Sequence, residues 1–287
     1  MAILDAFDRA SLGANWVEPT KLINPDGPLT MIAGLDGVEM TPAQVNSGYS
    51  VGIYIGQEFD FDKQYAEVEY FDEVVFPSYT GFKANYGSID IALNVPLAAV
   101  GSKRFVEFGF WPNMYTSGAY YRTIYWQIKS FGDSGVGSQN WEAYGYVVPE
   151  TFFTSDRIPV GTKTRLERIG NTYYAFLYSP DTGRWYLLGS ATPATVALYT
   201  DGYPGIRLYS QQLASDARAT NFRAGTNGDD FLIRGPTHKP GVKDKSNNRN
   251  MRESRFGLRE NDTAYRLGKF DLPATATFDN KNRNRFS

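Results

Sequence analysis

The sequence predicts an all-β body, folded as a two-sheet antiparallel sandwich, followed by an extended and largely irregular C-terminal arm. Glycine and proline recur roughly every eight to twelve residues, aromatic residues make up 15% of the chain, and the runs between turn residues alternate with a period of two. The alternation is clearest in 64–71, 88–93, 104–110 and 121–128. No amphipathic helical pattern of useful length precedes residue 234. These observations favour a sandwich of antiparallel strands.

The clearest predicted element is a three-strand meander between residues 164 and 189. Gly170-Asn171 separates the first two runs and forms a tight turn. In the second turn, Pro180 fixes φ at the second position, and Gly183 can take the left-handed conformation that closes such a hairpin. We therefore expect these three runs to pair in sequence order.

The charge distribution divides the chain into two domains, a body at 1–233 and an arm at 234–287. The arm has 13 Lys+Arg and six Asp+Glu, a net charge of +7, which leaves 16 basic and 25 acidic residues in the body, a net charge of −9. The arm has no Trp and too few clustered apolar residues to close a core. The body shows no internal linker, so we expect one sandwich there.

The composition excludes several kinds of catalytic site and metal site. The chain has no Cys and a single His, His238, in the loop-like segment 235–241. A Ser-His-Asp triad, a cysteine nucleophile and a thiolate or histidine metal site therefore cannot be built in the body, and we expect no cofactor and no metal. No window approaches 18 apolar residues, and the N-terminus lacks the pattern of a signal peptide. We expect a protein made in the host cytoplasm, without a membrane segment.

The opening run Leu4-Asp-Ala-Phe-Asp-Arg-Ala-Ser-Leu-Gly-Ala-Asn-Trp16 resembles the first strand of concanavalin A-like (LamG-type) jelly-roll domains, which are found in bacteriophage virion structural proteins. The stretches 166–185 and 202–225 resemble the late hairpin and the closing strands of the same fold. The resemblance spans residues 4–225 and excludes 234–287. It is specific for fold and says little about activity.

The resemblance implies that the first and last strands pair. This pairing would place Asp5 and Phe7 beside Asn221 and Phe222. We expect Phe7, Trp16 and Phe222 in the core, and we expect Gly13 in a turn.

Glycoside hydrolysis is an alternative, because some members of this broad fold use two carboxylates on one strand. Period-two alternation would place Glu67, Glu69, Phe71 and Glu73 on one face. Phe71 stands where the catalytic pattern of those members needs its central Asp. A solvated acidic strand face is the simpler interpretation, and we predict that the protein is not an enzyme.

Glycan binding is a second alternative, because 15 aromatic residues occur between Phe105 and Phe153. Flat rings stack on sugar faces in many lectin-like sandwiches. Aromatic residues are also the ordinary filling of a large sandwich core. The candidate glycan-binding residues are Trp111, Tyr115, Tyr120, Tyr121 and Trp141.

The arm carries the main functional prediction. Its apolar residues come singly between basic ones, a spacing that suits a ribbon docking one side chain at a time onto a neighbour. The predicted partner-binding residues are Arg249, Arg252, Arg255, Phe256, Arg259, Tyr265, Arg266, Phe270, Phe278, Arg283, Arg285 and Phe286. Residues 248–256 could form a short helix. The interspersed acids disfavour nucleic-acid binding, and a tail without a partner remains an alternative.

We predict a bacteriophage virion structural protein on the surface of the head or tail, most simply a capsid decoration or cementing subunit. Its arm would anchor it to major capsid or tail subunits and to the acidic body of other copies. Because the arm follows the closing strand, we expect attachment at the end near 222–225. The alternative is a tail- or baseplate-associated glycan-binding adhesion module.

Overall fold

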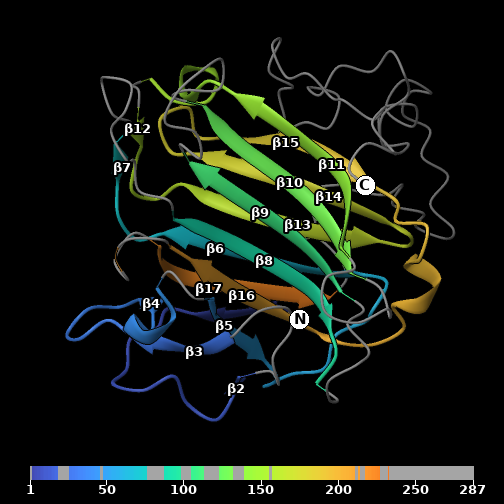
Figure 1. The fold of residues 1–287 in the computed structure, drawn as a ribbon, viewed down its shortest axis with the longest axis horizontal. Coiled ribbons are helices and arrows are strands. Elements are labelled where there is room, and N and C mark those ends of the chain that lie inside the picture. The colour runs from blue at the N-terminus through green and yellow to red at the C-terminus, as the bar shows by residue number, and fades with distance from the viewer. Residues whose placement is uncertain are drawn as a thin grey trace, which may run out of the picture.

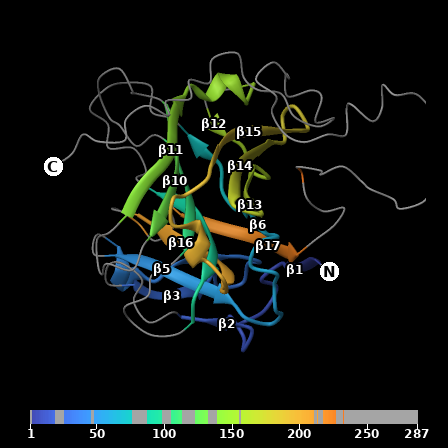
Figure 2. The same cartoon turned by 90° about the vertical axis from the view of Figure 1, so that its right-hand side faces the viewer.

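The computed structural model describes residues 2–18, 26–45, 48–75, 87–97, 105–112, 123–131, 139–154, 157–210, 213, 217–226 and 232. These residues form an all-β jelly-roll sandwich of two layers, seen face-on in Figure 1 and edge-on in Figure 2. The predicted arm 234–287, its partner-binding residues, the short helix at 248–256 and His238 lie outside the described residues. The domain boundary therefore stays a prediction.

The first layer, called sheet B here, is antiparallel between neighbouring strands from one edge to β5. In spatial order it contains β11 (Gln139–Val147), β10 (Ile124–Phe131), β9 (Val106–Pro112), β8 (Ser88–Val95), β16 (Tyr203–Tyr209) and β5 (Tyr49–Tyr54), with β2 (Trp16–Val17) paired to β5.

The second layer, sheet A, holds the predicted meander. In spatial order it contains β4 (Val38–Met40), β17 (Arg218–Thr226), β6 (Gln64–Tyr70), β13 (Lys163–Ile169), β14 (Thr172–Ser179) and β15 (Arg184–Ala191), with β1 (Ala2–Asp5) paired to β17. Both turns are as predicted, with Gly170 at φ 61° and Gly183 at φ 66°. The meander is confirmed.

One strand joins the layers. β3 (Asp26–Met31) pairs with β4 in sheet A through its second half and with β5 in sheet B through its first half. The β3–β5 pair is parallel, unlike the other strand pairs of the described residues. The small elements are β7 (Val74–Val75) paired with β12 (Arg157–Ile158), and the 3₁₀ turns η1 (Pro42–Gln44), η3 (Pro149–Thr151) and η4 (Val196–Leu198).

The core between the layers makes room for one large ring. Trp126 of β10 is 3% exposed. A Cβ on Gly189 of β15 would lie 2.4 Å from its Cη2 atom, and a Cβ on Gly145 of β11 would lie 2.7 Å from its Nε1 atom. The two glycines therefore allow the indole to lie between strands of opposite layers.

The predicted pairing of the first and last strands is confirmed, because Asp5 lies opposite Phe222 in the β1–β17 register. Phe7, Trp16 and Phe222 are all buried, and the Trp16 ring centroid lies 4.8 Å from that of Phe222 and 5.4 Å from that of Phe7. Gly13 has φ +81° and its carbonyl accepts from the Trp16 amide. These residues are core and turn residues, as expected.

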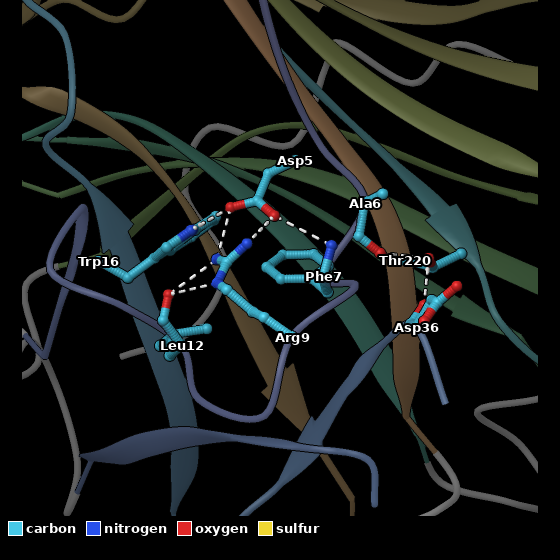
Figure 3. Close-up of polar contacts among 8 residues, drawn as sticks. All are labelled: Asp5, Ala6, Phe7, Arg9, Leu12, Trp16, Asp36 and Thr220. Atoms are coloured by element: carbon cyan, nitrogen blue, oxygen red, sulfur yellow. Dashed lines mark hydrogen bonds and ion pairs between the residues drawn. The ribbon is translucent and has the colours of Figure 1, made fainter. Parts of the chain in front are cut away.

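The opening motif is held together by one carboxylate (Figure 3). Asp5 accepts hydrogen bonds from Arg9 Nη1 at 2.6 Å, Arg9 Nη2 at 2.7 Å, Trp16 Nε1 at 2.7 Å and the Phe7 amide at 2.9 Å. Burial by itself raises the pKa of Asp5, but the hydrogen bonds from Arg9, Trp16 and Phe7 and the Arg9 charge lower it overall. The spacing of Asp5, Phe7, Arg9 and Trp16 thus has a structural explanation.

Candidate functional site

The outer face of sheet B, which points away from the core, carries polar and aromatic side chains. Strand alternation places one set of residues from β8, β9 and β10 in the core and the other set on this face, and both sets are buried. We call it the polar–aromatic face and define it by Asp90, Glu107, Gly109, Trp111, Tyr125, Gln127, Lys129, Trp141, Tyr144, Tyr146 and Arg207.

The strand register aligns these residues in rows across the sheet. One row runs from Arg207 of β16 through Asp90, Gly109 and Gln127 to Tyr144 of β11. A second row joins Trp111, Tyr125 and Tyr146, and a third joins Glu107, Lys129 and Trp141. Directly opposite residues are nearest neighbours on the same face. Gly109 therefore lies at the centre of the face without a side chain of its own.

Three polar atoms surround this glycine. A Cβ at Gly109 would lie 2.9 Å from Trp111 Nε1, 3.1 Å from Asp90 Oδ1 and 3.1 Å from Gln127 Nε2. The position that a Cβ would take is therefore bordered closely by a carboxyl, a carboxamide and an indole N–H. We call it the Gly109 notch.

Two groups at the notch are buried without a hydrogen-bond partner. Asp90 is 0% exposed, and neither of its oxygens has a partner among the described residues. Trp111 is 9% exposed, and its Nε1 likewise has none in that part of the chain. Ser88 lies near enough to favour the ionised form of Asp90 slightly, but it completes no hydrogen bond of normal geometry. An unmet buried polar group costs about 1–3 kcal/mol, so the notch is destabilising in the free protein.

Four ionisable side chains lie around the notch. Arg207 Nη1 forms an ion pair with Glu107 Oε2, and the guanidinium lies 3.8 Å from the centroid of the Tyr49 ring. Burial first, and then the charge of Glu107, raises the pKa of Asp90 well above its ordinary value, although Arg207 and Lys129 oppose the shift. Two acids and two bases therefore share this face.

Gln127 connects the notch to an aromatic edge. Its Oε1 accepts from the Tyr125 hydroxyl at 2.9 Å and from Trp141 Nε1 at 3.0 Å, so its amide N–H₂ is the group directed to the notch. Tyr125 and Tyr146 have ring centroids 4.9 Å apart. Trp141 is 50% exposed, with Lys129 Nζ 5.6 Å from its ring centroid.

The aromatic candidates from the sequence divide into three groups. Trp141 presents an exposed ring at the edge of the polar–aromatic face, whereas Trp111 is buried and offers only its N–H to the notch. Tyr115, Tyr120 and Tyr121 lie outside the described residues. Sequence reasoning missed Asp90, although an acid inside the otherwise apolar run 89–93 was a usable signal.

The carboxylates considered for hydrolysis lie on the other layer, on the outer face of sheet A. Glu67 is 3% exposed and pairs with Arg165 Nη1 at 3.0 Å, while Lys163 lies 3.5 Å from Glu69 and 3.8 Å from Glu67. The prediction of a solvated acidic face is wrong for Glu67, because β13 supplies cations directly opposite β6. The arrangement fits a structural ion-pair network.

No group of three or more Asp, Glu, His or Cys side chains in the described part of the chain is arranged to hold a metal ion. Among the same residues, no helix has the length and apolar character needed to cross a membrane.

No protein-family model matches the sequence, and no curated protein is significantly similar to it. Several solved structures resemble the chain. The CBM2 module of the evolved Dit of Lactobacillus casei BL23 phage J-1 is 7% identical, with a TM-score of 0.47 over 80% of this chain and 96% of that one. Lectin I-B4 from Griffonia simplicifolia, in its metal-free form, is 13% identical, with a TM-score of 0.47 over 79% and 100%.

A Bacteroides ovatus protein described as xyloglucan PUL GH43B is also 13% identical, with a TM-score of 0.39 over 77% of this chain and 37% of that one. At these values the similarities give no basis for assigning a ligand or an activity. The sandwich fold of this chain rests on its own strand order.

Proposed function

We propose that this chain binds a neutral oligosaccharide on its polar–aromatic face, as a component of a bacteriophage particle. One observation carries the binding proposal: Asp90 and Trp111 are buried beside the Gly109 notch, and neither the Asp90 oxygens nor Trp111 Nε1 has a hydrogen-bond partner among the described residues. A sugar hydroxyl both donates and accepts hydrogen bonds, so a single hydroxyl can pair with the carboxyl and the indole N–H together. The exposed Trp141 ring offers a flat apolar surface for an adjoining sugar.

The groups at the notch favour an uncharged ligand. Glu107 is paired with Arg207, and burial favours the protonated, uncharged form of Asp90, so Asp90, Trp111 and Gln127 around the notch carry no charge. An acidic glycan would need an excess of cations there, and a basic ligand would need an excess of acids. Neutral sugars instead need many hydrogen-bonding groups without net charge, which is what the face provides.

Binding without hydrolysis fits the carboxyl groups better than catalysis. Two-carboxylate hydrolysis needs one group to attack or activate water while the other donates a proton. Glu107 is committed to its ion pair with Arg207, and both side chains are 1% exposed. Asp90 then has no free carboxylate partner on this face among the described residues.

A glycan array probed with the purified full-length protein tests the proposal, followed by calorimetry with the best neutral oligosaccharide. Trp111→Phe keeps an aromatic ring but removes the indole N–H together with the pyrrole part of the ring. We expect it to weaken binding about tenfold, because one hydrogen bond contributes about 1.4 kcal/mol. Trp185→Phe on sheet A is the matched control and should bind as the unaltered chain does. The absence of any glycan ligand, or equal affinity of both variants, would exclude this use of the face.

A second function is favoured by the charge division, with −9 on the body and +7 on the arm. Together with the virion-protein resemblance of residues 4–225, it supports an anchoring arm that staples the protein to capsid or tail subunits, as in a decoration protein. Mixing full-length or arm-deleted protein with particles that lack it, followed by sedimentation at low and high salt, tests this role. We expect incorporation to need the arm and to weaken with salt; equal incorporation of both forms would move the interface to the sandwich.

A further inference from the structure

The outer face of sheet A has an apolar cluster that is covered by a residue from beyond the last strand. Phe176 of β14 and Leu187 of β15 lie opposite each other and are 0% and 1% exposed. They form a cluster separate from the main core, and Leu232 packs against it together with Tyr174 and Trp185. Leu232 follows the end of β17 by six residues.

Leu232 also makes a polar contact on this face. Its backbone amide donates to Glu167 Oε1 at 2.6 Å. Glu167 is 0% exposed, and Arg165 Nε donates to the same oxygen at 2.8 Å. A buried carboxylate needs such donors, because an unpaired buried charge is strongly unfavourable. The contact therefore combines apolar burial with a hydrogen bond to a buried charge.

The position of Leu232 shows where the chain goes after its last strand. β17 pairs with β6, and β6 pairs with β13, so Glu167 lies two strand spacings, or about 10 Å, from β17. Six residues can span roughly 20 Å. Leu232 thus lies over the outer face of its own sheet, within reach of the end of β17.

We propose that the outer face of sheet A is the docking surface for the start of this chain's own C-terminal arm, with Leu232 as its first fixed contact. The arm is the expected occupant of this surface because it continues directly from Leu232, with 55 residues following. The same face offers more room, in a cavity of about 370 Å³ lined in part by Leu4, Glu69 and Lys163. The surface around it is charge-balanced, with Lys163 and Arg165 pairing Glu67 and Glu69.

This docking defines how the domain would be oriented on a particle. The arm starts on the outer face of sheet A, while the polar–aromatic face belongs to sheet B, on the opposite side of the sandwich, as the edge-on view in Figure 2 shows. A particle that holds the arm then leaves the polar–aromatic face pointing away from it. This exit differs from the one predicted at 222–225, and it stands whether or not the face binds a glycan.

Limited trypsin digestion of the full-length protein tests the docking. Cleavage after Arg234 lies two residues beyond Leu232, whereas cleavage after Lys243 and Lys245 lies farther out and serves as an internal reference. We expect the bond after Arg234 to be cut about tenfold more slowly than the reference bonds, because a docked segment must detach before it is cleaved. Leu232→Asp should abolish that difference without altering the reference rates.

Leu213→Asp is the matched control, because Leu213 is 62% exposed and lies away from this cluster. It should leave the protection of Arg234 unchanged. Equal cleavage after Arg234 and Lys245 in the unaltered protein would overturn the proposal. Protection that falls on dilution would identify the arm of a second copy as the occupant and would overturn it as well.

Discussion

Replacing Asp5 by Asn tests whether the opening motif stabilises the fold as its contacts indicate. Asp5 accepts four hydrogen bonds, from two Arg9 nitrogens, the Trp16 indole and the Phe7 amide. An Asn offers one acceptor oxygen and places its N–H₂ against donors. At least one hydrogen bond to a charged group is then lost, which costs about 1.5–3 kcal/mol, and an unpaired Trp16 N–H would cost about 1–3 kcal/mol more.

The first contribution must be reduced, because the Arg9 side chain is 34% exposed and can return to water. The Trp16 side chain is only 5% exposed, so its N–H cannot find water as a replacement partner. We therefore expect Asp5→Asn to lower the free energy of unfolding by about 3 kcal/mol at pH 7, or the melting temperature by roughly 6–12 °C for a domain of this size. Urea and thermal denaturation measure both quantities. Asp8→Asn, at an exposed acid in the same segment, is the control and should change little.

The sign of the pH dependence follows from the lowered pKa of Asp5. Its contribution to stability is present above the unfolded pKa, about 3.9, and is lost as the pH falls through the lower folded value. The gap between Asp5→Asn and the unaltered protein should narrow below about pH 4. A gap that is constant from pH 7 to pH 2.5, or a loss under about 1 kcal/mol at pH 7, would refute the reasoning.

Three further predictions concern the notch and one strained turn. Gly109→Ala should reduce oligosaccharide affinity at least about tenfold by calorimetry. It should also lower the melting temperature, because the added Cβ would lie 2.9 Å from Nε1 of the buried Trp111 ring, which must then shift. Asp90→Asn should become increasingly more stable relative to the unaltered protein as the pH rises above the unfolded pKa of about 3.9, because the unfolded chain then releases the Asp90 proton that the folded chain still holds; denaturation at each pH checks this. Gly202→Ala should destabilise by about 3 kcal/mol in urea, because φ is +104° and a Cβ would lie 2.3 Å from the backbone of Asn94, whereas Gly34→Ala, at φ +71° with open space around it, should cost only about 1 kcal/mol.

The elements predicted correctly from the sequence depend on local signals. The meander is defined by turns whose glycines need positive φ, and these turns fix the pairing of the strands on either side. The pairing of the first and last strands was implied by the resemblance of residues 4–16 to concanavalin A-like domains, and the hydrogen bonds of Asp5 in that segment all lie within residues 5–16. Such features can be read before any long-range contact is known.

The charged faces could not be predicted, because their partners are distant in sequence. Glu107 pairs with Arg207 one hundred residues away, and Arg165 lies 98 residues from Glu67. Alternation says that such residues share the non-core side of a strand, but it does not say which strand lies beside them. The notch was missed for the same reason, since Gly109, Asp90 and Gln127 are neighbours only across three strands.

The buried carboxyl groups of the two outer faces differ in their hydrogen-bond partners. This difference distinguishes carboxyl groups that stabilise the fold from one that is available to a ligand. On sheet A, Glu67 and Glu167 are buried, yet each has a cation or N–H within hydrogen-bond distance. On sheet B, Asp90 is equally buried, and its oxygens find no donor among the described residues. Purely structural burial would favour an apolar residue or a paired one at that position. A carboxyl held beside a side-chain-free glycine and an unpaired indole N–H is instead the arrangement that a hydroxyl ligand would complete.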